Sequence, residues 1–159
     1  MTLATDILIN HLYRSPGHNF FGRHGQPPGE HGMIECRELQ CAAGRGIVGD
    51  RFFDFKPDYA GQITFFSSEV HEALCRELGV SDKAPSVFRR NVITTGLDLN
   101  ALIGEEFQIQ GVRFHGTEEC RPCDWMNRAF APGAEQFLKR RGGLRAVILS
   151  DGCLRLDHP

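Results

Sequence analysis

The sequence has no long hydrophobic run and no strong excess of charge of either sign. No apolar stretch approaches the roughly 20 residues that a membrane-spanning helix needs, and residues 1–6 lack the basic region and cleavage site of a secretory signal. The formal net charge of -2 at pH 7 gives no reason to expect nucleic acid or a membrane as a partner, because both favour a basic surface. We therefore expect a cytoplasmic protein that binds neither.

The composition is that of an ordinary soluble globular protein. Hydrophobic residues make up 41% and charged residues 24% of the 159 positions. A chain of this length can bury roughly two-thirds of its unfolded surface in one core, so we expect a single domain over residues 1–159 that needs no metal or disulfide to fold. Without a secretory signal, the six cysteines indicate reduced thiols rather than a disulfide framework.

Short apolar stretches that read as β-strands are joined mostly by glycine turns. Strands are predicted at residues 7–13, 33–40, 61–66, 106–109, 112–116 and 144–149. One helix is predicted at residues 69–78, opened by a serine cap and closed by Gly79, with shorter helical pieces at 124–130 and 133–140. Because strands outnumber helices, we expect a mainly β fold: a closed or nearly closed β-barrel of roughly six to eight strands with a few covering α-helices.

Residues 18–32 are too rich in glycine and proline for regular structure, and we expect a long surface loop there. The loop contains His18, His24 and His31, which are candidate metal ligands. Their irregular spacing favours a solvated loop over a metal site.

The strongest chemical signal is the run Cys120-Arg121-Pro122-Cys123, which lies between a predicted strand and a predicted helix. Two thiols three residues apart in such a turn can face one point in space. Thiolate is a strong soft-metal ligand and a good nucleophile, so chemistry is expected here. The alternative is an incidental contact between two loop cysteines.

Two further stretches are candidate binding elements. Residues 44–51 contain three glycines that allow a close approach to a ligand, and they end in Asp50 and Arg51; the alternative is a glycine-rich hairpin with a surface ion pair. Arg89 and Arg90 precede a predicted strand, where arginine can bind a phosphate or carboxylate in a bidentate way. The alternative for these arginines is a solvated edge.

Several of these stretches together resemble one family, the MOSC domain, named for the C-terminal domain of molybdenum-cofactor sulfurases. The matching pieces, in order, are Gly46-Ile47-Val48-Gly49-Asp50-Arg51, Arg89-Arg90-Asn91-Val92-Ile93, Gly96-Leu97-Asp98-Leu99, the cysteine run, and Arg141-Gly142-Gly143-Leu144-Arg145-Ala146-Val147. Each motif is weak alone, but the ordered set is fairly specific. The resemblance covers most of residues 33–152.

The resemblance implies a β-barrel that binds the molybdenum cofactor, a pterin dithiolene carrying a phosphate. It assigns the metal ligand and catalytic cysteine to Cys123, and it places Asp50, Arg51, Arg89 and Asn91 near the cofactor. Residue chemistry agrees, because molybdenum held by sulfur favours another thiolate and arginines suit a phosphate.

Three hypotheses about function follow. The leading one is a molybdoenzyme that reduces N-hydroxylated or N-oxygenated small molecules and takes electrons from a donor protein. The second is a sulfur carrier or cofactor-handling protein in which Cys123 carries a persulfide received from a pyridoxal-phosphate cysteine desulfurase. The third, a structural zinc site made by Cys120 and Cys123 with Cys36 and Cys41, is not expected, because the spacing of the second pair fits a zinc knuckle poorly.

Overall fold

The computed structural model describes residues 2–4, 7–16 and 33–157 of the chain. The predicted loop at 18–32 and its three histidines lie outside the described residues. Among the described residues, no helix is long and apolar enough to cross a membrane.

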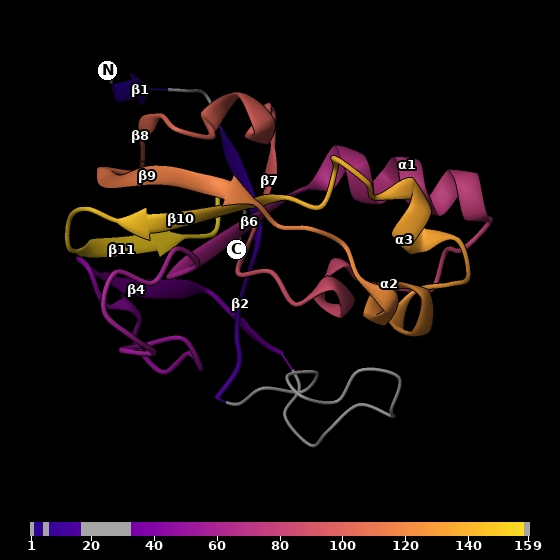
Figure 1. The fold of residues 1–159 in the computed structure, drawn as a ribbon, viewed down its shortest axis with the longest axis horizontal. Coiled ribbons are helices and arrows are strands. Elements are labelled where there is room, and N and C mark those ends of the chain that lie inside the picture. Colours follow the sequence, from indigo (N-terminus) through magenta and orange to yellow (C-terminus); the bar gives the residue numbers. More distant parts are fainter. Residues whose placement is uncertain (1, 5–6, 17–32, 158–159) are drawn as a thin grey trace.

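Most of the strands belong to one eight-stranded mixed sheet (Figure 1). Its order is β1-β8-β9-β10-β6-β7-β2-β3, with β1–β8 and β6–β7 parallel and the other neighbours antiparallel. The strands are β1 (Thr2–Ala4), β2 (Leu8–Arg14), β3 (Ile34–Cys36), β6 (Ile63–Ser67), β7 (Val92–Thr95), β8 (Glu106–Ile109), β9 (Val112–Glu119) and β10 (Leu144–Ile148). A separate antiparallel sheet has the order β11-β4-β5, formed by Gly152–Arg155, Glu38–Ala42 and Gly46–Ile47.

The mainly β composition with few helices is confirmed, but the expected barrel is wrong. In the described part of the chain neither sheet closes on itself: β1 and β3 are the two ends of the large sheet, and β4, β5 and β11 pair only with one another. Residues 33–40 were expected to form one strand, yet the pairing breaks at Arg37, so that β3 lies in the large sheet and β4 in the small one. An alternating pattern predicts which residues are in strands, but it does not predict which strands pair.

The large sheet is covered on both faces, because neighbouring residues of a strand point to opposite sides. Phe65 of β6 is buried in a core shared with the small sheet, which contributes Leu39 and Leu154. The next residue, Phe66, is buried in a second core with Leu74 of the first helix. Each side of the sheet therefore has its own hydrophobic contacts.

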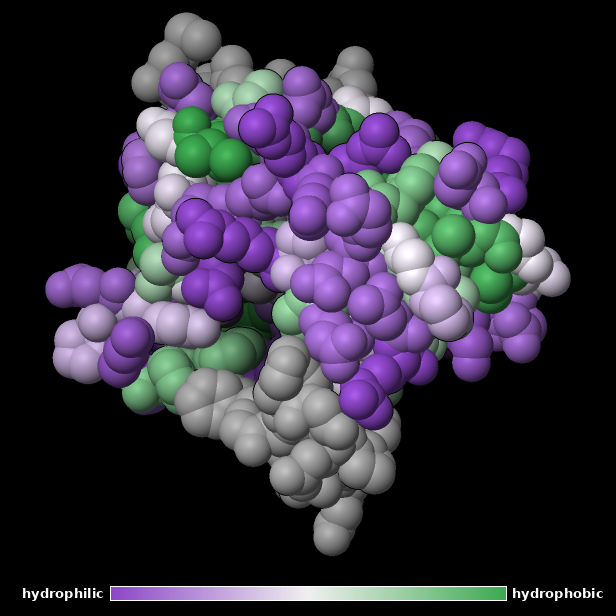
Figure 2. All heavy atoms as spheres, turned by 45° about the vertical axis from the view of Figure 1, so that its right-hand side comes forward, coloured by the Kyte–Doolittle hydropathy of each residue, from purple (hydrophilic) through white to green (hydrophobic). Residues whose placement is uncertain are grey.

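The helices gather on one side of the molecule, at the right of Figure 1. They are α1 (Ser68–Leu78), α2 (Asp124–Ala129) and α3 (Ala134–Phe137). The 3-10 turns are η1 (Pro85–Phe88) and η2 (Leu99–Leu102), and η2 lies apart from the helices, between β7 and β8 in the sequence. The predicted helix at 69–78 is confirmed: the Ser67 side chain accepts a hydrogen bond from the Val70 N–H, and Gly79 ends the helix in the left-handed conformation. The face seen in Figure 2 is mostly hydrophilic, with hydrophobic residues in separate small groups.

Candidate functional site

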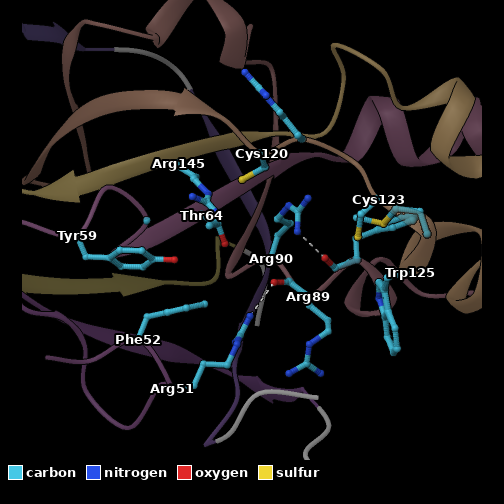
Figure 3. Close-up of a pocket in the computed structure, with 14 residues that line it drawn as sticks. Arg51, Phe52, Tyr59, Thr64, Arg89, Arg90, Cys120, Cys123, Trp125 and Arg145 are labelled. Atoms are coloured by element: carbon cyan, nitrogen blue, oxygen red, sulfur yellow. Dashed lines mark hydrogen bonds between the residues drawn. The ribbon is translucent and has the colours of Figure 1, made fainter. Parts of the chain in front are cut away.

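A pocket of about 220 Å³ lies where the large sheet meets the helices. The elements that form it are the segment after β5, the start of β6, the η1–β7 connection, the cysteine run, α2 and β10 (Figure 3). Its lining residues are Arg51, Phe52, Tyr59, Gly61, Thr64, Phe88, Arg89, Arg90, Cys120, Arg121, Cys123, Trp125, Met126 and Arg145.

The lining is strongly cationic. Five of its side chains are arginines, and none of the described side chains that line it is a carboxylate or a histidine. Two of the arginines have acidic partners outside the lining: Arg51 lies 3.3 Å from Asp50 and Arg145 lies 3.3 Å from Glu118. The pocket is therefore suited to an anion, although the whole chain carries a net charge of -2.

Asp50 lies behind the pocket and holds the segment that carries Arg51. Its carboxylate accepts hydrogen bonds from the backbone N–H of Ser15 at 2.9 Å, from the backbone N–H of Phe52 at 3.3 Å and from the Arg51 guanidinium at 3.3 Å. The Arg51 guanidinium also lies over the Phe52 ring, 4.7 Å from its centre. Asp50 thus positions Arg51 and does not itself line the pocket.

Arg89 enters the pocket from an unusual backbone conformation. Its φ of 60° lies in the left-handed region, which non-glycine residues rarely adopt, and it ends the η1 turn. Burial and the neighbouring charge of Arg51 lower the pKa of Arg89 to about 10. The fold therefore holds this cation in a place where water does not fully solvate it.

Asn91 is a structural hydrogen-bonding residue. Its amide oxygen accepts from the Thr64 backbone N–H at 2.9 Å and from the Thr64 hydroxyl at 3.1 Å, and its amide nitrogen donates to the Tyr13 carbonyl at 3.1 Å. These bonds join β6, β7 and β2 beneath the pocket. Asn91 is buried and is absent from the lining.

Arg90 links the η1 turn to the turn before β10. Its side chain donates to the Gly142 carbonyl at 3.1 Å and to the Phe88 carbonyl at 2.8 Å. Gly142 packs against the cysteine run so closely that a Cβ there would lie 1.9 Å from the carbonyl oxygen of Cys120. The glycine at this position is what allows the two segments to touch.

Both cysteines of the run line the pocket, in different surroundings. Cys120 is buried, and its backbone N–H donates to the Gly143 carbonyl at 2.9 Å. Burial raises the pKa of the Cys120 thiol despite the opposing effect of Arg90 and Arg145. Cys123 is half-buried directly before α2, and in Figure 3 Arg90 is drawn between the two cysteines.

Aromatic residues complete the pocket, and sequence reasoning missed them. Tyr59 stacks on Phe52 with ring centres 5.2 Å apart, and Trp125 donates its indole N–H to the Val87 carbonyl at 2.7 Å. Arg145, in the final strand of the resemblance, was also not selected as a site residue. No local pattern marks Tyr59, because the pocket forms from segments that lie far apart in the sequence.

Of the predicted site residues, the structure brings Arg51, Arg89 and Cys123 to the pocket and leaves Asp50 and Asn91 behind it. No group of three or more His, Cys, Asp or Glu side chains within the described residues could hold a metal ion. The four cysteines of the zinc alternative are therefore not gathered into such a site.

Several solved structures share the fold. The YuaD protein from Bacillus subtilis aligns with a TM-score of 0.71 and 17% identity over 94% of this chain and 91% of its own. YiiM from Escherichia coli aligns with a TM-score of 0.60 and 19% identity over 92% of this chain and 66% of its own. YiiM from Geobacillus stearothermophilus aligns with a TM-score of 0.66 and 12% identity over 94% and 71%.

A search of curated protein sequences gave no match. The model of the MOSC domain matches residues 24–155, which is most of the chain and includes both cysteines of the pocket. The chain therefore belongs to the MOSC domain family.

Proposed function

We propose that the pocket binds the molybdenum cofactor through Cys123 and that the protein reduces N-hydroxylated or N-oxygenated small molecules. The MOSC family is associated with binding of this cofactor. The observation that carries the proposal is the lining itself, in which five arginines accompany two thiols and no carboxylate is present among the residues that the structure describes.

The residues present fit the group. A thiolate is a suitable ligand for a metal that prefers sulfur, and Cys123 is the less buried of the two pocket thiols. Guanidinium groups bind phosphate oxygens in a bidentate way, and the buried Arg51 and Arg89 have lowered pKa values that an anion would counteract. Both chemical ends of a phosphorylated pterin dithiolene thus have matching side chains.

Each residue then has a separate task. Cys123 would hold the metal, and Arg51 and Arg89 would hold the phosphate. Asp50 and Asn91 would not contact the cofactor. Asp50 would hold the segment that carries Arg51, and Asn91 would hold together the strands beneath the pocket. When bound, the cofactor supplies two-electron, oxygen-atom-transfer chemistry, with electrons coming from a donor protein.

A sulfur-carrier function is the second candidate. A half-buried thiol beside several arginines is also suited to a persulfide anion received from a pyridoxal-phosphate cysteine desulfurase. This alternative predicts a protein that holds no molybdenum under any expression condition.

Metal and pterin content will distinguish these functions. Protein purified from a host that makes the cofactor should contain molybdenum, measured by elemental analysis, and pterin, measured by fluorescence, in near-equal amounts. Cys123→Ser should lose the molybdenum, because a hydroxyl is a harder and less acidic ligand than a thiol, whereas Cys120→Ser should keep most of it. Equal losses in the two variants would contradict the assignment of Cys123 as the sole protein ligand.

A further inference from the structure

The pocket contains few groups that can supply a proton. Cleavage of an N–O bond by reduction consumes two electrons and two protons and releases water. At neutral pH the five arginines of the lining are protonated, including Arg89 with its pKa lowered to about 10, and they act there as fixed positive charges. With Cys123 assigned to the metal, the remaining neutral proton donors among the described lining residues are the Tyr59 phenol and the Cys120 thiol.

The two groups differ in access. The Cys120 side chain is buried at the end of β9, with 4% of the residue exposed. Tyr59 is half-buried, and Figure 3 shows its hydroxyl pointing into the pocket toward the labelled arginines. That hydroxyl makes no hydrogen bond to any residue in the described ranges, so it can bond to a molecule that enters.

The Tyr59 ring is held firmly in place. It stacks on Phe52 with ring centres 5.2 Å apart and contacts Phe55 at 4.8 Å. Gly61 lies beneath it, where a Cβ would be 3.4 Å from the phenol oxygen. The backbone carbonyl of Ala60, the residue after Tyr59, accepts a hydrogen bond from the Thr117 hydroxyl at 2.7 Å. This bond ties the Tyr59 segment to β9. The phenol is thus fixed before a ligand arrives, as a proton donor must be.

The surroundings of Tyr59 keep its phenol protonated until a ligand binds. The groups that face it are Arg51, Lys56, Cys120, Glu118 and Arg145. Burial raises the pKa of the Tyr59 phenol against the lowering effect of Arg145 and Arg51, so the phenol keeps its proton at neutral pH. The same two arginines would stabilise the phenolate that forms once the proton has left.

We infer that Tyr59 is a catalytic proton donor to the oxygen atom that leaves the substrate. For a hydroxylamine the overall change is R–NH–OH + 2 e⁻ + 2 H⁺ → R–NH₂ + H₂O, with both electrons supplied by an external reductant. As the N–O bond breaks, the Tyr59 O–H bond breaks and its proton joins the leaving oxygen, which departs as water. The second proton reaches the nitrogen from the solvent, and the solvent also returns a proton to the phenolate. The inference rests on the proposed function.

The test compares Tyr59→Phe with the wild type and with Tyr13→Phe. These are the only two tyrosines of the chain, and Tyr13 is a matched control because its ring is buried in the second core, with Phe66 and Leu74. The loaded proteins are assayed with benzamidoxime and reduced methyl viologen over a range of pH. Molybdenum content, pterin content and the thermal midpoint are measured on the same samples.

We expect Tyr59→Phe to keep its metal, its pterin and its thermal midpoint, while kcat falls by roughly 100-fold and KM changes little. The wild type should lose activity at alkaline pH as the phenol ionises, and Tyr59→Phe should show a smaller decline, because the loss of the Arg89 charge near its pKa of about 10 remains in both proteins. Tyr13→Phe should keep the kcat and KM of the wild type at neutral pH.

An unchanged kcat or an unchanged alkaline decline in Tyr59→Phe would overturn the role of Tyr59 and leave the proposed function standing. Loss of cofactor from this variant would overturn the inference as well, because it would make Tyr59 a binding residue. A wild type that contains molybdenum and pterin but does not reduce the amidoxime, or that contains neither, would overturn the proposed function and the Tyr59 step with it.

Discussion

The Arg51 guanidinium donates a hydrogen bond to the backbone carbonyl of Arg89 at 3.2 Å, so one cationic side chain of the pocket is tied to the backbone that carries another. Burial and repulsion by neighbouring arginines lower the pKa of each guanidinium, which Asp50 only partly offsets. The fold holds these charges close in the absence of an anion. Binding of a phosphate would relieve the repulsion, which connects the geometry of this pair to the proposed ligand.

Arg89→Ala should reduce retention of the cofactor without destabilising the empty protein. The substitution removes a buried charge that Arg51 repels, and the free energy gained in this way offsets the contacts that are lost. The thermal midpoint of cofactor-free protein should therefore stay the same or rise. Pterin content should fall in the order wild type, Arg89→Lys, Arg89→Ala, because lysine keeps the charge but lacks the planar fork. A lysine variant that retains no more pterin than the alanine variant would argue against a charge-dependent site.

Arg51→Ala should behave differently from Arg89→Ala, because Arg51 is the partner of a buried carboxylate. The substitution removes the ion pair with Asp50 and the hydrogen bond to the Arg89 carbonyl. We expect a loss of about 1–3 kcal/mol in the free energy of unfolding, measured by urea denaturation, together with lower pterin content. An unchanged stability would show that the remaining backbone donors satisfy Asp50.

Asn91→Ala should cost stability more than it affects the pocket. Without the amide group, the partly buried Thr64 backbone N–H loses its 2.9 Å partner, and the Tyr13 carbonyl loses a donor. The expected loss is about 1–3 kcal/mol in the free energy of unfolding. Molybdenum content per folded protein should stay near that of the wild type, which would separate this residue from Arg89.

The sequence predicted most elements of the fold because their signals are local. The serine cap and the left-handed Gly79 delimit α1 within the chain itself, and both are present. Local signals could not show whether the sheet closes into a barrel, because closure depends on which strands pair. The parallel pairing of Phe65 in β6 with Val92 in β7 joins residues separated by a whole helix, and no local pattern predicts it.

The site was predicted in part for a similar reason. Arg51, Arg89 and Cys123 were found through ordered motifs, and the fold brings them to one pocket. The same motifs also contain residues such as Asn91 whose task is to hold the strands, and a motif does not distinguish the two tasks. Tyr59 belongs to no motif and faces the pocket only because its segment folds back over Gly61.

Alkaline pH should destabilise the protein through Tyr13. Burial raises the pKa of the Tyr13 phenol from 10.0 to about 12 in the folded protein. The folded state binds the phenol proton of Tyr13 more tightly than the unfolded state does. The contribution of this proton to the free energy of unfolding is therefore complete below pH 10.0 and is lost as the pH rises toward 12. In urea denaturation, Tyr13→Phe should reduce the loss of unfolding free energy between pH 8 and pH 11 by about 1 kcal/mol. The same loss in both proteins would assign it to other groups.

Gly142→Ala should disturb the cysteine run directly. The new Cβ would lie 1.9 Å from the carbonyl oxygen of Cys120 and 3.3 Å from Pro122, so one of the two segments must move. We expect a loss of about 1–3 kcal/mol in the free energy of unfolding and a marked loss of molybdenum, since displacement of the run moves Cys123 away from the arginines.

Gly44→Ala is the matched control: a Cβ there meets no atom within 4 Å, and only the φ of +73° is unfavourable. That variant should lose about 1 kcal/mol through backbone strain and keep its molybdenum. Equal molybdenum contents in the two variants would mean that the close contact between Gly142 and Cys120 does not fix the position of the ligand.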